Sequence, residues 1–284
     1  MKRPLANPLL TKRRLLGALA AAACALSLAY AAAATPAAGA SAITWSPAEF
    51  ECPVCKTKNT FLVWNSYGSY IYSWPSKFEL IFWPYTDDPT VYSCKQCRLS
   101  AFMGDFEKTP KEKHDAIRKA LEGVTLKPRA PSADDALYGE AVYLRVPVTE
   151  RLLAAQKVYE VLGRDDDFWG HFQRVLGYHF EQEKKPKEAD EARRRALAIA
   201  ERMLADPARS GKRKELLYVT GAMRHFLKDD ARALKDFQEA LRLRYEDKAL
   251  KAEQNDNYNK YLDGLLGEYV KKLQTNAAPP KSTG

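Results

Sequence analysis

The chain has 284 residues, of which 45 are basic and 36 are acidic, and its formal net charge at pH 7 is +9. Five of the basic residues lie among the first 14, which contain no acid; without these five, 40 basic residues face 36 acidic ones and the net charge is +4. Most of the excess charge therefore belongs to the N-terminal segment. It is not the broad basic surface of a nucleic-acid-binding protein, so nucleic acid is not expected as a partner.

Residues 1–40 have the three parts of a secretory signal. The charged start is followed by the 20-residue apolar block LLGALAAAACALSLAYAAAA and then by small residues, with Ala38 and Ala40 in an Ala-x-Ala pattern. We therefore expect an exported, extracytoplasmic protein, with the periplasm as its compartment. Two alternatives stay open: the block is retained as a membrane anchor, since it is long enough to span a bilayer, or Cys24 is lipidated. Membrane contact is expected only in those two cases.

Residues 41–107 form a segment that is rich in aromatic side chains and contains four of the five tryptophans of the chain. Apolar and polar residues alternate in SYIYSW (69–74) and in KFELIFW (77–83), and turn residues separate and flank these stretches. This pattern predicts short strands. A β unit of this size buries too little surface to be stable alone, so a staple is expected.

Four cysteines are spaced to supply that staple. Cys52 and Cys55 form CPVC, Cys94 and Cys97 form CKQC, and 38 residues separate the two pairs. Two such turns that face each other hold one zinc ion in a tetrahedron of four sulfurs, which leaves no open position and predicts a structural ion. Disulfides are a second interpretation, because exported thiols meet oxidants. A redox-active pair is a third, although no strand-helix-strand pattern surrounds either pair.

The residue after each cysteine pair is unusual. Many zinc-binding turns have glycine there, because the backbone takes a positive φ, whereas this chain has Lys56 and Arg98. At least one turn is therefore expected to be strained or to have a different shape. Together with Lys58 and Lys95, these side chains either balance the negative charge of a zinc ion with four thiolates or simply face solvent.

A connecting helix is expected over residues 108–123, followed by a partly ordered linker over 124–146, which contains two prolines and no long periodic pattern. The residues expected to delimit the helix are Thr109 as N-cap, Pro110 at the first position, Glu112 in a capping box and Gly123 at the end.

Residues 147–274 are expected to be helical and to contain a repeat. LGYHFEQEKKPKEADEARRRAL and TGAMRHFLKDDARALKDFQEAL align without gaps at a spacing of 44 residues. The matching residues are Gly177 with Gly221, Ala189 with Ala233, Ala196 with Ala240, and Leu197 with Leu241. This order is similar to the tetratricopeptide repeat, whose small residues let paired helices approach closely. Phe237 fits the aromatic position of that pattern, and Arg193 departs from it. Residues 275–284 predict a disordered tail.

No catalytic constellation is visible in the sequence. The acids of RDDDFW (164–169) are explained by a helix start, where carboxylates favour the positive end of the dipole. Phosphate-binding glycine loops and nucleophile motifs are missing as well, so an enzyme is not expected. The histidines lie on expected helices without a spaced partner for a metal: His114, His171, His179 and His225.

The order of these features resembles that of a bacterial family of unknown function, in which a head with two Cys-x-x-Cys pairs precedes tetratricopeptide-like helices. The most specific match is VYSCKQCRLSAFMGDFEK, with a strand entering the second pair and then Asp105-Phe106. Members usually have Gly at the position of Arg98, and the aromatic strands between the pairs differ from their usual insert. The resemblance covers about residues 50–274. It implies a metal-binding head and a helical scaffold, and no catalytic activity.

The expected fold class is α+β, mainly α, with a small aromatic-rich, zinc-ribbon-like β head followed by tetratricopeptide-like helical repeats. The expected function is that of an exported scaffold or adaptor whose repeats bind a protein partner. The alternative is an envelope thiol-disulfide oxidoreductase or redox sensor that uses one Cys-x-x-Cys pair. A nucleic-acid-binding zinc ribbon would require that residues 1–40 are not a signal. The expected ligands of the structural zinc ion are Cys52, Cys55, Cys94 and Cys97.

Overall fold

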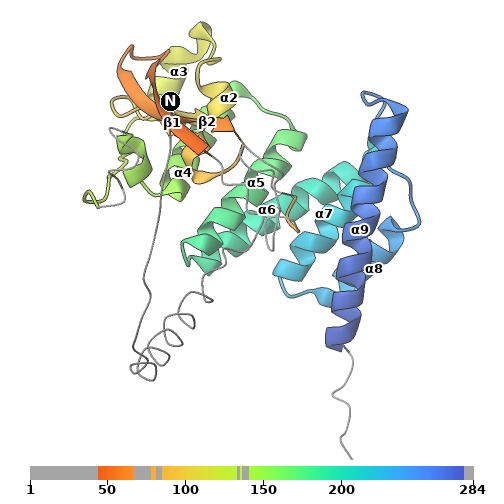
Figure 1. Ribbon diagram of the computed structural model, residues 1–284. Coiled ribbons are helices and arrows are strands. Elements are labelled where there is room, and N and C mark those ends of the chain that lie inside the picture. Colours follow the sequence, from red (N-terminus) through yellow and green to blue (C-terminus); the bar gives the residue numbers. More distant parts are fainter. Residues whose placement is uncertain (1–43, 67–77, 81–84, 133–134, 136–140, 278–284) are drawn as a thin grey trace, which may run out of the picture. The chain divides into compact units, whose positions relative to one another are not determined.

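A computed structural model of the chain describes residues 44–66, 78–80, 85–132, 135 and 141–277 (Figure 1). These residues form a mainly helical protein with a small N-terminal β region of two hairpins, which holds the four cysteines. The predicted fold class is confirmed. The predicted signal segment lies outside the described residues. Within the described part, no helix has both the length and the hydrophobicity that a membrane span requires.

Each hairpin consists of two antiparallel strands. β1 (Thr44–Glu51) pairs with β2 (Lys58–Ser66), and β3 (Val91–Ser93) pairs with β4 (Ser100–Phe102). The loop of each hairpin is a Cys-x-x-Cys sequence with the two residues that follow it. The hairpins therefore present both cysteine pairs at strand ends.

The strands predicted between the two cysteine pairs are not observed where the structure describes this part of the chain. Residues 69–74 lie outside the described residues, and of 77–83 only Phe78, Glu79 and Leu80 are described, in a turn. All three are buried, each about 1% exposed. The strand prediction rested on alternating residues and required that one face of the strand is exposed to solvent. The strand prediction is wrong at these residues because both apolar and acidic side chains are enclosed by helices.

Short helical segments connect the hairpins to the main helices. They are η1 (Asp88–Thr90), α2 (Met103–Phe106), η2 (Lys111–Lys113), α3 (His114–Ala120) and η4 (Val142–Arg145). The predicted capping box is wrong, because the Thr109 hydroxyl donates to the Phe106 carbonyl (3.0 Å) and Pro110 occupies the N-cap position of η2. Gly123 has a φ of +75°, as a residue that ends a helix does.

The remaining helices are longer. They are α4 (Val148–Leu162), α5 (Asp166–Gln182), α6 (Pro186–Ala205), η5 (Pro207–Lys212), α7 (Arg213–Phe226), α8 (Asp230–Ala240) and α9 (Ala252–Ala277). The acidic run at 164–169 begins a helix as predicted, since the Asp165 carboxylate accepts from the Phe168 amide (2.9 Å) at the N-terminus of α5. α9 ends at Ala277, three residues into the predicted tail.

The 44-residue register is present in the backbone. α5 and α7 end at Gln182 and Phe226, and α6 and α8 begin at Pro186 and Asp230. The loops between them also match: Lys184 and Lys228 have φ values of +59° and +67°. The two helical hairpins therefore repeat the same turn, and the extra residues of the first copy lengthen α6 and form η5.

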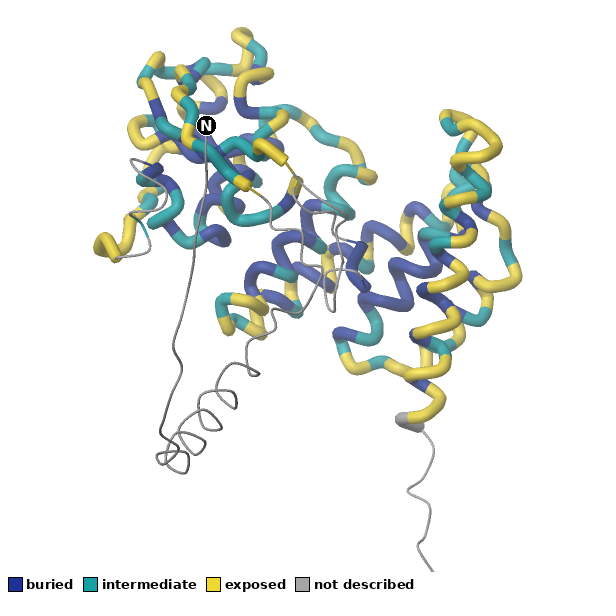
Figure 2. Tube along the Cα trace, viewed as in Figure 1, coloured by how far each residue is buried: buried dark blue, intermediate teal, exposed yellow. Residues whose placement is uncertain are grey.

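The hairpins share a hydrophobic core with the helices. One cluster of buried residues takes members from both hairpins, α3, η4, α4, α5 and the start of α6. A second cluster takes members from α6, α7, α8 and α9, together with Phe78 and Leu80. Figure 2 shows buried positions running along α5, α6 and α7. The β region consequently does not depend on its own small core alone.

Candidate metal centre

The two Cys-x-x-Cys loops have the same backbone hydrogen bonds. In the first loop the Cys52 amide donates to the Thr57 carbonyl (2.9 Å), and in the second the Cys94 amide donates to the Leu99 carbonyl (2.8 Å). In both loops the acceptor lies five positions after the first cysteine. Each loop therefore directs its two sulfurs to the same side.

The four sulfur atoms lie together. The Sγ atoms of Cys52 and Cys97 are 3.5 Å apart, as are those of Cys55 and Cys94, and all four lie within 4.8 Å of one another. Sulfurs around tetrahedral zinc are about 3.8 Å apart, since the Zn–S bond is about 2.3 Å. A disulfide would need about 2.05 Å, and all four cysteines are free thiols. The donor set and its spacing fit one ion bound by four sulfurs.

Lys56 and Arg98 both take the left-handed conformation that usually calls for glycine. Their φ values are +65° and +61°. The cause is a bond back across the loop: the Lys56 amide donates to the Cys52 carbonyl (2.9 Å), and the Arg98 amide donates to the Cys94 carbonyl (3.0 Å). The expectation that at least one turn is strained is confirmed, and it holds for both. Each side chain costs about 1 kcal/mol at such a φ.

Asn59, in β2, connects the two loops. Its Oδ1 accepts from the Lys95 amide (2.9 Å), and its Nδ2 donates to the Thr57 carbonyl (2.8 Å) and lies 3.6 Å from the Cys94 sulfur. An N–H group directed at a thiolate stabilises its negative charge. The sequence analysis missed Asn59. The available signal was an amide at an inward position of a strand, where an apolar residue is usual.

The thiols differ in acidity. Hydrogen bonds with Cys52 and then with Cys97 lower the pKa of Cys94 well below its usual range. The hydrogen bond with Cys94 raises the pKa of Cys52 to about 12, and hydrogen bonds with Cys52 and Cys94 raise the pKa of Cys97. Of these three thiols, Cys94 therefore loses its proton most readily, and it is the one that faces the Asn59 amide.

The basic side chains beside the first loop face solvent. Lys56 pairs with Glu51 (3.4 Å) and Lys58 pairs with Glu49 (2.8 Å), and all four side chains are more than half exposed. Pairs of this kind contribute little to stability. For these two lysines the solvated interpretation holds.

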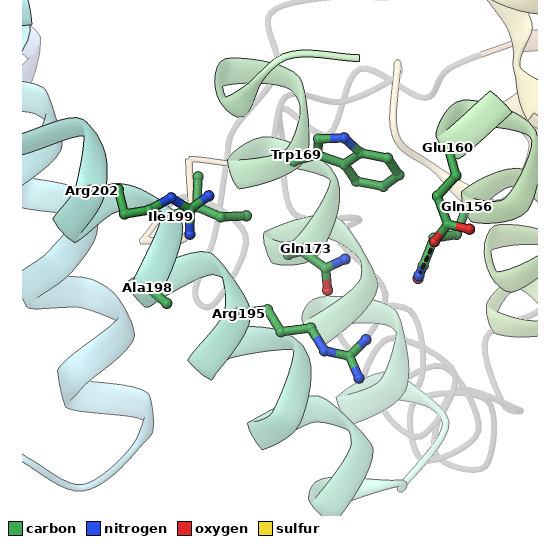
Figure 3. A pocket seen from close by; sticks show the side chains of 8 residues that line it. All are labelled: Gln156, Glu160, Trp169, Gln173, Arg195, Ala198, Ile199 and Arg202. Carbon is green, nitrogen blue, oxygen red and sulfur yellow. Dashed lines mark hydrogen bonds between the residues drawn. The ribbon is translucent and has the colours of Figure 1, made fainter. Parts of the chain in front are cut away.

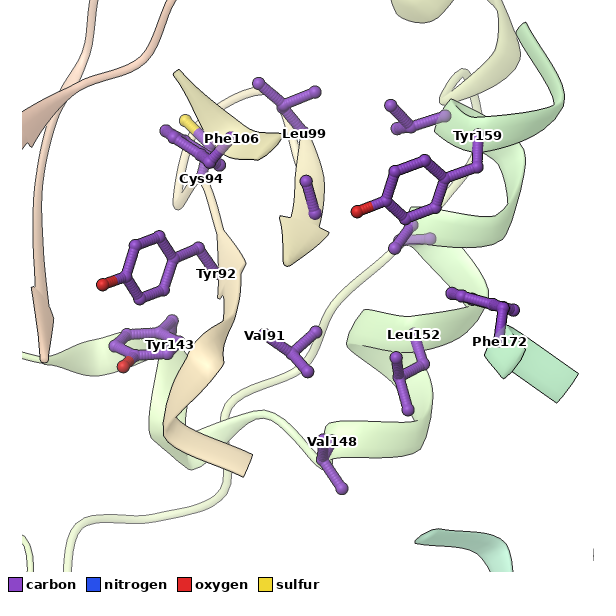
Figure 4. Packing of buried hydrophobic residues seen from close by; sticks show 14 of the residues in the cluster. Val91, Tyr92, Cys94, Leu99, Phe106, Tyr143, Val148, Leu152, Tyr159 and Phe172 are labelled. Carbon is purple, nitrogen blue, oxygen red and sulfur yellow. The ribbon is translucent and has the colours of Figure 1, made fainter. Parts of the chain in front are cut away.

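An aromatic layer lies beneath the cysteines. The rings of Phe61 and Tyr92 stack with centroids 4.2 Å apart, and Phe106 meets Phe61 edge-on at 5.0 Å. Figure 4 shows Cys94 and Phe106 with Tyr92 and Tyr143 in this packed group. The loop of the second hairpin is therefore seated on buried rings.

Asp105 ties this region to the helices. Its carboxylate accepts from the Tyr159 hydroxyl of α4 (3.0 Å) and pairs with Arg164 (3.0 Å). The same Tyr159 oxygen accepts from the Phe102 amide (2.9 Å). The Asp105-Phe106 dipeptide thus has two tasks, an anchor on α4 and a ring in the aromatic layer.

Within the described residues, the four cysteines form the one group of three or more side chains that could hold a metal ion. None of the described histidines belongs to this cysteine group. The Nε2 of His179 lies 2.8 Å from the Thr86 carbonyl, and His225 pairs with Asp230. Burial lowers the pKa of His171 to about 3 and also lowers that of His179. These two rings are held neutral by their surroundings.

The fold and the site together define a class of protein, a mainly helical chain whose N-terminal pair of hairpins holds a four-cysteine cluster. Residues 46–261 match the bacterial family described as "Uncharacterized protein conserved in bacteria (DUF2225)", and the chain belongs to that family. The resemblance seen in the sequence is confirmed. Comparison with curated proteins and with solved structures finds no match.

Proposed function

We propose that this protein is an exported scaffold or adaptor, stapled by a structural zinc ion, whose helices bind a protein partner and which catalyses no reaction. The observation that carries the proposal is the closed set of sulfurs. Four thiolates complete a tetrahedral shell, so an ion held there has no position for a substrate. Cys52 and Cys94 are also almost fully buried. The signal-like residues 1–40 support export.

Zinc is the ion that we assign. Tetrahedral sites of four thiolates are typical of zinc and of iron-sulfur centres, and zinc alone among these has no redox chemistry. When bound, zinc would join the loops of the two hairpins at Cys52, Cys55, Cys94 and Cys97. Because the hairpins share a core with α4 and α5, the ion would stabilise the helical part as well.

The surface that we assign to the partner is an open pocket of about 730 Å³ lined by α4, α5 and α6 (Figure 3). Trp169 and Ile199 supply apolar surface, and Arg195 and Arg202 supply positive charge. Aromatic and arginine side chains are enriched where protein partners bind most strongly. The pocket therefore has the composition of a protein-binding site.

Two amide oxygens of this pocket support the assignment. The Oε1 atoms of Gln156 and Gln173 are buried and accept no hydrogen bond within the described part of the chain, and Gln156 instead uses its Nε2 to donate to Glu160 (3.0 Å). A buried acceptor without a donor costs about 1–3 kcal/mol. If the two glutamine side chains turned outward, backbone N–H groups of a partner segment could satisfy both oxygens and so offset this cost.

The metal is tested on the mature protein, purified without chelator. We expect one zinc ion per chain and four thiols that react only after the ion is removed. Cys94→Ser is expected to abolish zinc binding, and Ser93→Ala, a neighbouring substitution outside the cluster, is expected to leave it intact. A protein with neither zinc nor free thiols would show that the cysteines form disulfides.

The partner surface is tested with a matched pair of positions on α6. A photo-crosslinking residue at Arg195, which lines the pocket, is expected to capture one defined partner in the envelope, and the same residue at the exposed neighbour Arg194 is not. The purified partner should then bind the wild type and Arg194→Glu with equal affinity and bind Arg195→Glu at least tenfold more weakly. Equal capture from both positions would rule out the pocket.

A second candidate function rests on the Cys-x-x-Cys spacing, which redox-active dithiols share, and on the incomplete burial of Cys55 and Cys97. It is the envelope thiol-disulfide oxidoreductase or redox sensor. Rapid alkylation of one native cysteine, and disulfide exchange that is lost in Cys94→Ser, would favour it over the scaffold. Slow alkylation of all four native thiols would exclude it, in line with the burial of Cys94.

A further inference from the structure

Residues Phe78, Glu79 and Leu80 belong in sequence to the insert between the cysteine pairs, but in space they belong to the helices. Phe78 and Leu80 are members of the cluster formed by α6, α7, α8 and α9. The short segment lies beside these helices in Figure 1. The helical repeats therefore enclose three residues that come from another part of the chain.

Phe78 enters an aromatic site built by three helices. Its ring centroid lies 3.9 Å from that of Tyr269 in α9, and it is 1% exposed. Other rings within 6.0 Å of Phe78, from α7 and α8, include Tyr218, His225, Phe226 and Phe237. A site lined by several rings selects an aromatic or large apolar side chain.

Two arginines donate hydrogen bonds to Glu79. The Arg193 Nε donates to its Oε1 (2.8 Å), with both side chains at most 4% exposed, and Arg174 Nη1 donates to the Glu79 carbonyl oxygen (2.8 Å). Arg193 also pairs with Glu181, and its guanidinium carbon lies 3.9 Å from the Phe226 ring centroid. Arg193 is the residue that departs from the repeat pattern. Its place beside an acid explains why an aromatic residue is absent there.

The enclosed segment is an imperfect occupant of this site. The second carboxylate oxygen of Glu79, Oε2, is buried and accepts no hydrogen bond within the described residues. Leu80 has a φ of +52°, which is strained for a residue with a branched side chain. A covalently attached segment tolerates such defects because its effective concentration is high, in the millimolar range for short flexible tethers.

We propose that the groove that α5 to α9 form around Phe78 is a binding site for a segment of a protein partner that presents an aromatic residue, a glutamate and an aliphatic residue in succession. In the free protein this groove is occupied by the chain's own segment Phe78, Glu79 and Leu80. This tethered segment would compete with the partner segment for the same site. The proposal rests on the adaptor function and adds a second, self-occupied surface to the open pocket. A partner segment that satisfies both carboxylate oxygens without the strained leucine displaces the resident one.

The test uses a fluorescent synthetic peptide, PSKFELIFWP, and the full mature protein. Weak binding is expected for the wild type and at least tenfold tighter binding for the Phe78→Ser/Leu80→Ser variant, in which the resident segment no longer fills the groove. In that variant, Arg193→Met or a peptide with Ala in place of Phe is expected to lose at least tenfold in affinity. Arg194→Met, on the same helix, is the matched control and should change nothing.

Folding of each variant is checked by far-UV circular dichroism and zinc content. If the double variant does not fold, Phe78→Ala, which removes one aromatic anchor of the resident segment, is expected to bind the peptide more tightly than the wild type by a smaller factor. Folded variants that bind no better than the wild type, or binding that ignores Arg193, would overturn the proposal and make the segment a permanent part of the core. Photo-crosslinking from Arg195 tests the adaptor function at a different surface. Failure of the groove proposal can therefore be told apart from failure of the adaptor function.

Discussion

Arg193 and Phe237, which are 44 residues apart, cover the two equivalent glycines of the helical hairpins. A Cβ atom added at Gly177 would lie 3.1 Å from Arg193 Cγ, and one added at Gly221 would lie 2.5 Å from the Phe237 ring. The aliphatic stem of arginine thus packs where the second copy has a ring. The two contacts differ in how far the covering side chain would have to move to admit a methyl group.

Gly221→Ala is expected to destabilise the protein by about 1–2 kcal/mol, because the Phe237 ring is buried and fixed and overpacking of this kind outweighs the gain in helix propensity. Gly177→Ala is the matched comparison and is expected to cost less, because its Cβ atom would lie 3.1 Å from Arg193 Cγ and needs only a small shift. Urea denaturation of both variants measures the difference. Equal losses would show that the two glycines do not differ in packing.

Arg98→Gly is expected to stabilise the second cysteine loop by about 1 kcal/mol, because it removes the strain of a side chain at a φ of +61°. Arg98→Ala keeps a Cβ atom at that φ and should give no gain, so it isolates the conformational effect from the loss of charge. Thermal unfolding of the zinc-loaded protein is the measurement. A gain in both variants would assign the effect to charge instead.

Asn59→Ala is expected to weaken zinc binding by about tenfold to a hundredfold, as substitutions behind a metal ligand commonly do. The reason is the loss of the amide beside the Cys94 sulfur and of the bond to Lys95 in the opposite loop. Competition with a chromophoric chelator reports the affinity. Asn65→Ala, an exposed substitution near the end of the same strand, should leave the zinc affinity unchanged. A similar loss of affinity in Asn65→Ala would show that the Asn59 amide has no specific role.

Glu79 makes stability depend on pH. Burial raises its pKa from 4.5 to about 7, although Arg193 acts in the opposite direction, and Arg174 and Glu181 are the other charged groups nearby. Between pH 4.5 and 7 the folded state holds a proton that the unfolded state releases, so the free energy of unfolding falls as pH rises through this range.

Relative to Glu79→Gln, which does not titrate, the wild type is expected to lose up to about 3 kcal/mol between pH 5 and 8. Urea unfolding of the two zinc-loaded proteins side by side gives this difference, because the effect of pH on the cysteine cluster is common to both. A difference that does not change with pH would place the Glu79 pKa outside this range.

The cysteine cluster and the helical register could be predicted from the sequence because both are carried by local spacing. Two residues between cysteines are enough to place two sulfurs on one loop. The shared offset of Gly177 and Gly221 is similarly visible without tertiary information. Strain in at least one of the turns that contain Lys56 and Arg98 could be expected for the same reason, since it depends on the loop alone.

What could not be predicted depends on partners distant in sequence. The alternation around Phe78 is a local signal, and it cannot show that helices more than 100 residues away will enclose the segment. Asn59 acts through Lys95 of the other hairpin, and Asp105 acts through Tyr159 of α4. Thr109 was misread as a helix cap because its competing acceptor, the Phe106 carbonyl, becomes available only once α2 has formed.

The core that joins the hairpins to α4 and α5 sets the size of the smallest autonomous piece of this protein. A fragment that stops before Val148 would leave the inner sides of both hairpins in water, with the hydroxyl of Tyr159 missing from its two partners. Such a fragment should neither fold nor retain an ion, even with all four cysteines intact. The unit that would hold an ion is thus larger than the segment that contains the four cysteines.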